Sequence, residues 1–123
     1  NKAVIGFDQA FLDAQIQKIP SEIRESYEVI KSRDMLLEFM PKGVTKAYGL
    51  SLLVRDLGLK QTEVMSIGDE ENDLSMIEYA GMGVAMGNAV AQVKAVADIV
   101  TATNEEDGVA KVVETYILQE GSD

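Results

Sequence analysis

Short apolar runs of β type alternate with helical patterns throughout the chain after Gly43. The strand-like runs are at 64–67, 83–86 and 99–101, and the helical patterns are at 45–57, 72–80, 89–97 and after 107. Strands that are separated by helices pair in parallel, because each crossover returns the chain to the same end of the sheet. Buried parallel strands are also continuously apolar, as these runs are. The alternation therefore predicts an α/β fold with a parallel sheet flanked by helices.

The residues before Gly43 follow a different pattern. They predict a strand at 3–7, a helix that Asp8 caps and Pro20 ends, a helical turn at 21–26, and strands at 27–31 and 35–40 joined by a turn at 32–34. The pattern changes near Pro41. We therefore expect two units, one at 1–41 and the other at 42–123.

Two of the later helices carry apolar residues at a spacing that places them on one face. Thr45 is a favourable N-cap for the first, and Gly58 is its expected C-terminal stop. The apolar stripe of the first helix consists of Leu50, Leu53, Val54 and Leu57. In the last helix, the stripe that we expect to be buried consists of Val109, Val112, Val113, Tyr116 and Ile117.

A small parallel sheet leaves an edge that proteins normally cover. Only three strands are visible after Gly43, so we expect the first strands of this sheet to lie upstream of Asn1. A chain without them would expose apolar surface. For such a chain we expect a homodimer or higher oligomer through the uncovered sheet edge.

Composition excludes several classes of chemistry and partner. The chain has no cysteine and no histidine, which excludes zinc–thiolate sites, thiol nucleophiles and Ser-His triads. Its formal net charge of −10 disfavours nucleic-acid and membrane partners. It has no apolar run of the ~20 residues that a membrane helix requires, and its first residues lack a signal-peptide layout. We expect a cytoplasmic protein.

An acidic cluster follows the strand-like run at 64–67. Asp69 comes directly after Gly68, and Asp73 lies one helical turn further on, so both carboxylates can face one point. The carboxyl ends of buried strands are where open α/β sheets bind ligands, and such oxygen ligands favour Mg²⁺. Asn72 offers an amide that can hold a phosphate oxygen. The same residues would also serve as ordinary first-turn caps, so both interpretations remain open.

Among the remaining charged and polar residues, one lysine is a candidate functional residue. Lys46 stands at the first position of the helix that Thr45 caps, where a cation opposes the helix dipole unless it faces an anion. A solvated lysine is the alternative, and Lys42 competes for the same role from the linker. We expect Glu70 and Glu71 to point to solvent, and turn or capping roles account for Asn88, Asn104 and Asp107.

Taken together, these segments resemble the haloacid dehalogenase superfamily of phosphatases, and within it the Cof-type sugar-phosphate phosphatases. The resemblance is strong from Pro41 to the C-terminus and weaker before it. The similar segments are Pro41-Lys42-Gly43-Val44-Thr45-Lys46, Leu57-Gly58-Leu59, Gly68-Asp69-Glu70-Glu71-Asn72-Asp73, the run from Ala80 to Ala89, and Asp107-Gly108-Val109-Ala110.

The resemblance implies a Rossmann-like core, preceded by part of an α/β cap domain at 1–41, and phosphoryl transfer through an aspartyl-phosphate. Lys46 would be catalytic and would neutralise the phosphate and the nucleophile. Asp69 would bind Mg²⁺, and Asp73 would support the metal directly, support it through water, or pair with Lys46. Asn72 would bind the phosphate of a small phosphorylated metabolite or orient the lysine.

The chain departs from the family pattern in one important respect. The superfamily's nucleophile lies in a DxD motif near the N-terminus, and no such motif exists in this sequence. The chain is therefore similar to the C-terminal part of such a phosphatase, and we expect it to be inactive alone.

Other functions remain as alternatives. A phosphomutase shares the same core but transfers the phosphoryl group to a substrate hydroxyl, and a non-catalytic, self-associating domain would also fit the missing nucleophile. A P-type ATPase domain has a similar acidic stretch, but no membrane spans accompany it here. A receiver domain places its lysine after its acids, whereas Lys46 precedes them.

Overall fold

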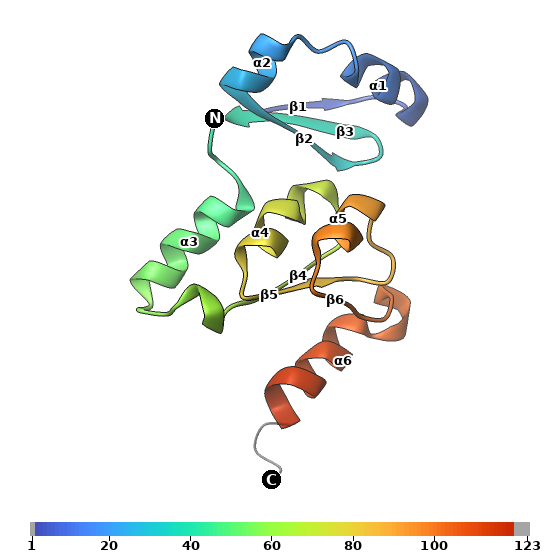
Figure 1. Ribbon diagram of the computed structural model, residues 1–123. Coiled ribbons are helices and arrows are strands. Elements are labelled where there is room, and N and C mark those ends of the chain that lie inside the picture. The colour runs from blue at the N-terminus through green and yellow to red at the C-terminus, as the bar shows by residue number, and fades with distance from the viewer. Residues whose placement is uncertain (1, 120–123) are drawn as a thin grey trace.

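Residues 2–119, which the computed structural model describes, form two three-stranded sheets stacked along the long axis of the molecule (Figure 1). The first is antiparallel with the order β1-β3-β2, and the second is parallel with the order β4-β5-β6. The strands are β1 (Ala3–Gly6), β2 (Tyr27–Arg33), β3 (Leu36–Pro41), β4 (Met65–Gly68), β5 (Met82–Ala85) and β6 (Ile99–Val100). The predicted α/β class and parallel sheet are confirmed.

The helices are short, and most of them surround the second sheet. α1 (Gln9–Ile16) and α2 (Ser21–Ser26) belong to the first sheet, and α3 (Lys46–Asp56), α4 (Leu74–Tyr79), α5 (Ala91–Val96) and α6 (Gly108–Val113) to the second. The 3-10 turns are η1 (Gln61–Glu63), η2 (Glu71–Asp73) and η3 (Asn104–Glu106), and a π-helical stretch, η4 (Glu114–Leu118), continues α6.

α1 and α2 cover one face of the first sheet (Figure 1). The Asp8 carboxylate accepts a hydrogen bond of 3.0 Å from the Phe11 backbone N–H, which confirms it as the cap of α1. Leu12 of α1 and Leu37 of β3 are both buried. The other face of this sheet, which these helices do not cover, faces the second sheet.

The hairpin turn in the first sheet lies slightly later than its predicted position at 32–34. β2 extends to Arg33, which pairs with Leu36, so the connection consists of residues 34 and 35. The register shifts between Lys31 and Arg33, which makes a β-bulge at Ser32. A bulge inserts one residue into the strand and prolongs it before the turn.

The core of the second sheet lies around β5, its central strand. Val84 and Ala85 are fully buried, because β4 and β6 flank them and α4 and α5 pack above. Ile77 of α4 and Val93 of α5 belong to this core and are also inaccessible. The uninterrupted apolar character of the strand-like runs follows from this burial.

The apolar face predicted for α3 is only partly buried. Val54 is 6% exposed, but Leu53 and Leu57 are 55% and 63% exposed. The ends of the helix are as expected, since the Thr45 hydroxyl accepts from the Tyr48 N–H at 3.2 Å and Gly58 takes a positive φ of 69°. The burial is partial because α3 packs on α4 and leaves its outer side uncovered.

The prediction that the apolar stripe of the last helix is buried was wrong. Val112 is buried, whereas Val109, Tyr116 and Ile117 are exposed. Figure 1 shows α6 leading away from the sheet toward the C-terminus, so only its beginning can bury side chains against neighbours. Within residues 2–119, no helix combines the length and the apolar character that crossing a bilayer demands.

Candidate active site

Asp73 is the most tightly held acid of the predicted cluster. It ends η2 rather than lying inside a helix that begins at Asn72, and only 5% of its surface is exposed. Its Oδ2 accepts hydrogen bonds from the backbone N–H groups of Asp69 at 3.0 Å and Glu70 at 3.2 Å. Asp73 therefore folds back over the end of β4.

Gly68, the last residue of β4, makes this position of Asp73 sterically accessible. A Cβ built on Gly68 would lie 2.5 Å from the Asp73 Cβ and 2.8 Å from its Oδ2, which is far inside contact distance. The absence of a side chain, rather than an unusual backbone angle, is what the site requires at this residue.

Lys46 meets Asp73 from a different element. Its Nζ donates a hydrogen bond to Asp73 Oδ1, and this links the start of α3 to η2 across 27 residues of sequence. Nearly half of the lysine side chain (47%) is exposed, whereas 8% of the aspartate side chain is. The pair thus explains a cation at the first position of a helix, and it leaves the ammonium accessible to a second anion.

Lys42, the competing lysine, lies elsewhere. Its Nζ donates to the Arg24 carbonyl at 3.1 Å and is 3.8 Å from a Glu28 carboxylate oxygen. Both partners belong to the first sheet and its helices. Lys42 therefore anchors the linker.

Opposing effects act on the Asp73 carboxyl. Burial raises its pKa, while the hydrogen bonds from Lys46 and from the N–H groups of Asp69 and Glu70, together with the charge of Lys46, lower it. The lowering effects prevail, and the pKa of Asp73 lies below its ordinary value. Asp73 is accordingly a carboxylate at neutral pH.

Asp69 lies at the same sheet edge and is held by residues that sequence reasoning assigned only to turns. The Asn88 amide donates from Nδ2 to Asp69 Oδ2 at 3.2 Å, and Asn88 Oδ1 accepts from the Asn104 N–H at 2.9 Å. The Asn104 contact fixes which end of the amide faces Asp69. The sequence feature that could have identified Asn88 is its place in the loop after β5, because the carboxyl ends of parallel strands share one edge of the sheet.

Asn72 and Lys46 face a common cleft between the two sheets. The cleft has a volume of about 450 Å³, and its opposite wall comes from β2 and β3. The structure therefore brings all four predicted site residues, Lys46, Asp69, Asn72 and Asp73, to the carboxyl end of β4. Sequence reasoning missed the residues of the facing wall, which include Ser32 and Arg33.

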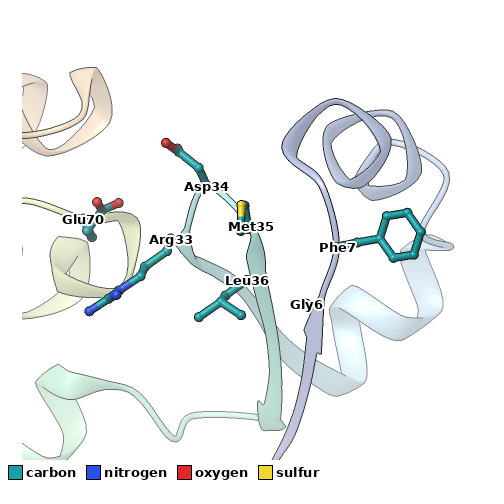
Figure 2. Close-up of a pocket in the computed structure, with 7 residues that line it drawn as sticks. All are labelled: Gly6, Phe7, Arg33, Asp34, Met35, Leu36 and Glu70. Atoms are coloured by element: carbon teal, nitrogen blue, oxygen red, sulfur yellow. The ribbon is translucent and has the colours of Figure 1, made fainter.

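The expectation that Glu70 points to solvent was wrong. Glu70 is half-buried and lines a second, adjoining cleft of about 700 Å³, where Figure 2 shows it opposite Arg33 and the hairpin turn. Burial and the nearby carboxylates of Asp69, Asp34 and Asp73 raise the pKa of Glu70, and Arg33 partly offsets this. Glu71, for which the same was expected, is also half-buried.

A family model described as haloacid dehalogenase-like hydrolase matches residues 1–113. Among curated proteins of Bacillus subtilis, the stress response protein YhaX is 49% identical over 72% of this chain and 31% of its own length. The 5-amino-6-(5-phospho-D-ribitylamino)uracil phosphatase YcsE is 40% identical over 92% of this chain and 46% of its own length. The chain spans less than half the length of each of these relatives.

Solved structures agree with this assignment. A haloacid dehalogenase-like hydrolase from Bacteroides thetaiotaomicron superposes with a TM-score of 0.71 at 44% identity, over 93% of this chain and 43% of that one. A sugar phosphatase of subclass IIB superposes with a TM-score of 0.78 at 33% identity, over 94% of this chain and 42% of that one.

Proposed function

Because this chain belongs to the haloacid dehalogenase-like hydrolase family, we propose that it supplies the lysine and acidic residues of a magnesium-dependent phosphatase for small phosphorylated metabolites such as sugar phosphates. Residues 1–41 would be part of the cap domain and residues 42–123 part of the Rossmann-like core. The observation that carries the proposal is the contact of Lys46 with Asp73, since two distant segments meet at a strand end that also presents Asp69.

Lys46 would be the catalytic cation of this site. A phosphate dianion that approaches a carboxylate nucleophile is repelled unless cations offset the charge, and the same cations stabilise the transition state. The exposed part of the Lys46 side chain faces the cleft, and Asp73 holds its position. Asn72, which lines the same cleft, would donate its amide N–H to a phosphate oxygen.

The acidic residues fit a bound Mg²⁺ in the manner usual for this ion. Mg²⁺ is commonly held by one or two carboxylates together with water and substrate phosphate. Within residues 2–119, no three acidic side chains form a complete metal cage. Asp69 has Oδ2 oriented by Asn88 and a second oxygen without a described partner. Both oxygens of Asp73 already accept hydrogen bonds, so its support for the ion would pass mainly through the position of Asp69.

When bound, Mg²⁺ would supply positive charge against the phosphoryl oxygens. The nucleophilic carboxylate that would attack phosphorus, while the bond to the leaving oxygen breaks, has no counterpart in the family's DxD pattern here. We therefore propose that this chain alone forms no aspartyl-phosphate. The named activities of relatives such as YcsE favour water, rather than a substrate hydroxyl as in a phosphomutase, as the final phosphoryl acceptor.

A metal titration tests the proposed role of Asp69. Calorimetry with Mg²⁺ should show weak binding to the wild-type chain and none to Asp69→Asn. Glu71→Gln is the matched control, because it removes one negative charge from the same cluster and should leave binding in place. Equal Mg²⁺ affinity in Asp69→Asn and the wild type would contradict the assignment.

A phosphate titration tests Lys46 separately. In Mg²⁺ buffer, inorganic phosphate should shift the amide resonances around Lys46 and Asn72 in the wild-type chain. Lys46→Ala should abolish these shifts, whereas Lys42→Ala, which removes the linker lysine, should preserve them. Phosphate shifts that survive in Lys46→Ala, or measurable phosphatase turnover by the purified chain, would each refute part of the proposal.

A further inference from the structure

We propose that Arg33, assisted by Ser32, forms a second anion subsite that selects phosphorylated substrates carrying another anionic group, such as a carboxylate. This inference rests on the proposed function, because it takes Lys46 and Asn72 as the site of the transferred phosphoryl group. Arg33 and Ser32 line the same cleft of about 450 Å³ as those two residues, from the opposite wall. The cleft has the size of a small-metabolite site.

The β-bulge determines which side chains this wall presents. In a regular strand, neighbouring residues point to opposite faces of the sheet. The register shift between Lys31 and Arg33 interrupts that alternation, and as a result Ser32 and Arg33 both line the cleft. Figure 2 shows the Arg33 side chain extending from the end of β2 toward the second sheet. Bulges commonly re-aim a side chain in this way beside functional sites.

Among the described residues, Arg33 is the one basic residue of the cleft that has no ion pair. Three basic residues line the cleft, although the chain has a net charge of −10. Lys2 pairs with Glu38 at 2.9 Å, and Lys46 pairs with Asp73. In the part of the chain that the structure describes, Arg33 makes no ion pair within 4.0 Å.

Acidic groups lie in both clefts that Arg33 lines, and Glu38, the one in the Lys46 cleft among the described residues, already pairs with Lys2. Glu70 and Asp34 line the adjoining cleft with Arg33, and the charge of Arg33 lowers the pKa of Glu70. Neither carboxylate comes within 4.0 Å of the guanidinium in the described part of the chain. A ligand anion in the Lys46 cleft would therefore compete with a longer-range attraction rather than with an ion pair.

The chemistry of the wall favours a planar anion over a neutral hydroxyl. The guanidinium presents a fork of N–H donors that matches a carboxylate or phosphate, and such charge-assisted pairs are stronger than neutral hydrogen bonds. The Ser32 hydroxyl adds one donor beside it. Ile30, Met40 and Val44 also line the cleft and would provide apolar contact for a short carbon skeleton.

Three probes that differ in one group test the subsite: inorganic phosphate, glycerol 3-phosphate and 3-phosphoglycerate. Glycerol 3-phosphate and 3-phosphoglycerate have the same number of carbons, and only 3-phosphoglycerate has a carboxylate. Each is titrated into the isotope-labelled chain in Mg²⁺ buffer, and amide and Arg33 Nε–H resonances are followed. Without a subsite, an acidic protein should bind the more anionic probe less tightly.

We expect the wild-type chain to prefer 3-phosphoglycerate over glycerol 3-phosphate by on the order of tenfold, as one charged hydrogen-bonded contact would give. Arg33→Ala should remove this preference and leave the affinity for inorganic phosphate unchanged. Arg33→Lys should retain part of it, because the charge remains and the fork is lost. Arg55→Ala, which removes an exposed cation paired with Asp56, is the control and should bind all three probes as the wild type does.

The possible failures are distinguishable. If inorganic phosphate binds but the organic probes bind equally, or if Arg33→Ala weakens all three alike, the subsite is refuted and the proposed function stands. If no probe shifts the resonances around Lys46 and Asn72, the proposed function fails, and the subsite fails with it. The same spectra report whether each variant is folded, and Arg33→Lys gives the decisive comparison if the alanine variant is not.

Discussion

Replacement of Gly68 by alanine should disrupt the candidate active site, because the new side chain would collide with Asp73. The new Cβ would lie 2.5 Å from the Asp73 Cβ, and 2.8 Å from both its Cγ and its Oδ2. The nearest of these atoms, the Asp73 Cβ, cannot swing aside, because the backbone of η2 fixes its position. Either the end of β4 or the turn that carries Asp73 must therefore move.

The size of the effect follows from what that movement breaks. Overpacking a filled site costs about 1–3 kcal/mol. Displacement of Asp73 would also weaken its hydrogen bonds from Lys46, Asp69 and Glu70. Complete loss of one charged hydrogen bond costs about 1.5–3 kcal/mol of stability. Because the turn can relax and keep some of these bonds, we expect Gly68→Ala to lower the free energy of unfolding by about 2–4 kcal/mol.

Urea denaturation followed by circular dichroism measures this change, and Gly49→Ala is its matched control. Gly49 lies within α3, and a Cβ built on it meets no atom within 4 Å. The same substitution should there raise the free energy of unfolding by about 0.5–1 kcal/mol, because alanine is the better helix former. If Gly68→Ala is as stable as the wild type, the close packing of Asp73 on β4 is not a feature of the molecule in solution.

Three further predictions concern the same region. Because the folded-state pKa of Asp73 lies below its unfolded value, the carboxylate stabilises the fold above pH ~4, and this contribution is lost as the pH falls through the folded pKa. In metal-free buffer, the difference in unfolding free energy between the wild type and Asp73→Asn should therefore be largest near neutral pH and shrink in acid; a difference that does not vary with pH would argue against the ion pair. Lys46→Met should lower the free energy of unfolding by about 1 kcal/mol, a modest value because the lysine is half-exposed. Urea denaturation should show no such loss when the same substitution is made in Asp73→Asn. Thr45→Ala should cost about 1 kcal/mol through loss of the α3 N-cap, whereas Thr115→Ala, at an exposed hydroxyl that caps no helix, should have a smaller effect in the same assay.

Local sequence signals predicted the elements well where one residue type determines the outcome. Asp8 and Thr45 cap the helices that they were expected to cap, and Gly58 ends α3 with a positive φ. The parallel sheet followed from the alternation of helices with apolar strands. The meeting of Lys46 with the acidic cluster could also be anticipated, because an unpaired cation at a helix start calls for an anion nearby.

Features that depend on tertiary surroundings were not accessible in this way. The exposure of Leu53 and Leu57 depends on what lies outside α3, and helical spacing cannot report that. The bulge at Ser32 leaves no clear mark in the sequence, so the cleft wall that contains Arg33 was missed. Asn88 satisfies a turn pattern by itself, and only the adjacency of β4 and β5 reveals its contact with Asp69.

The contrast between the two sheets has a consequence for the order in which the molecule folds. The β2–β3 hairpin closes over a two-residue connection, and hairpins form within about 1–10 μs. The parallel pairs of β5 must wait for their helical crossovers, and contacts between distant residues slow folding. Pulse-labelled hydrogen exchange should therefore show amides of β3 protected before those of β5. The residues proposed to handle phosphate would then assemble last, after the wall that faces them is already in place.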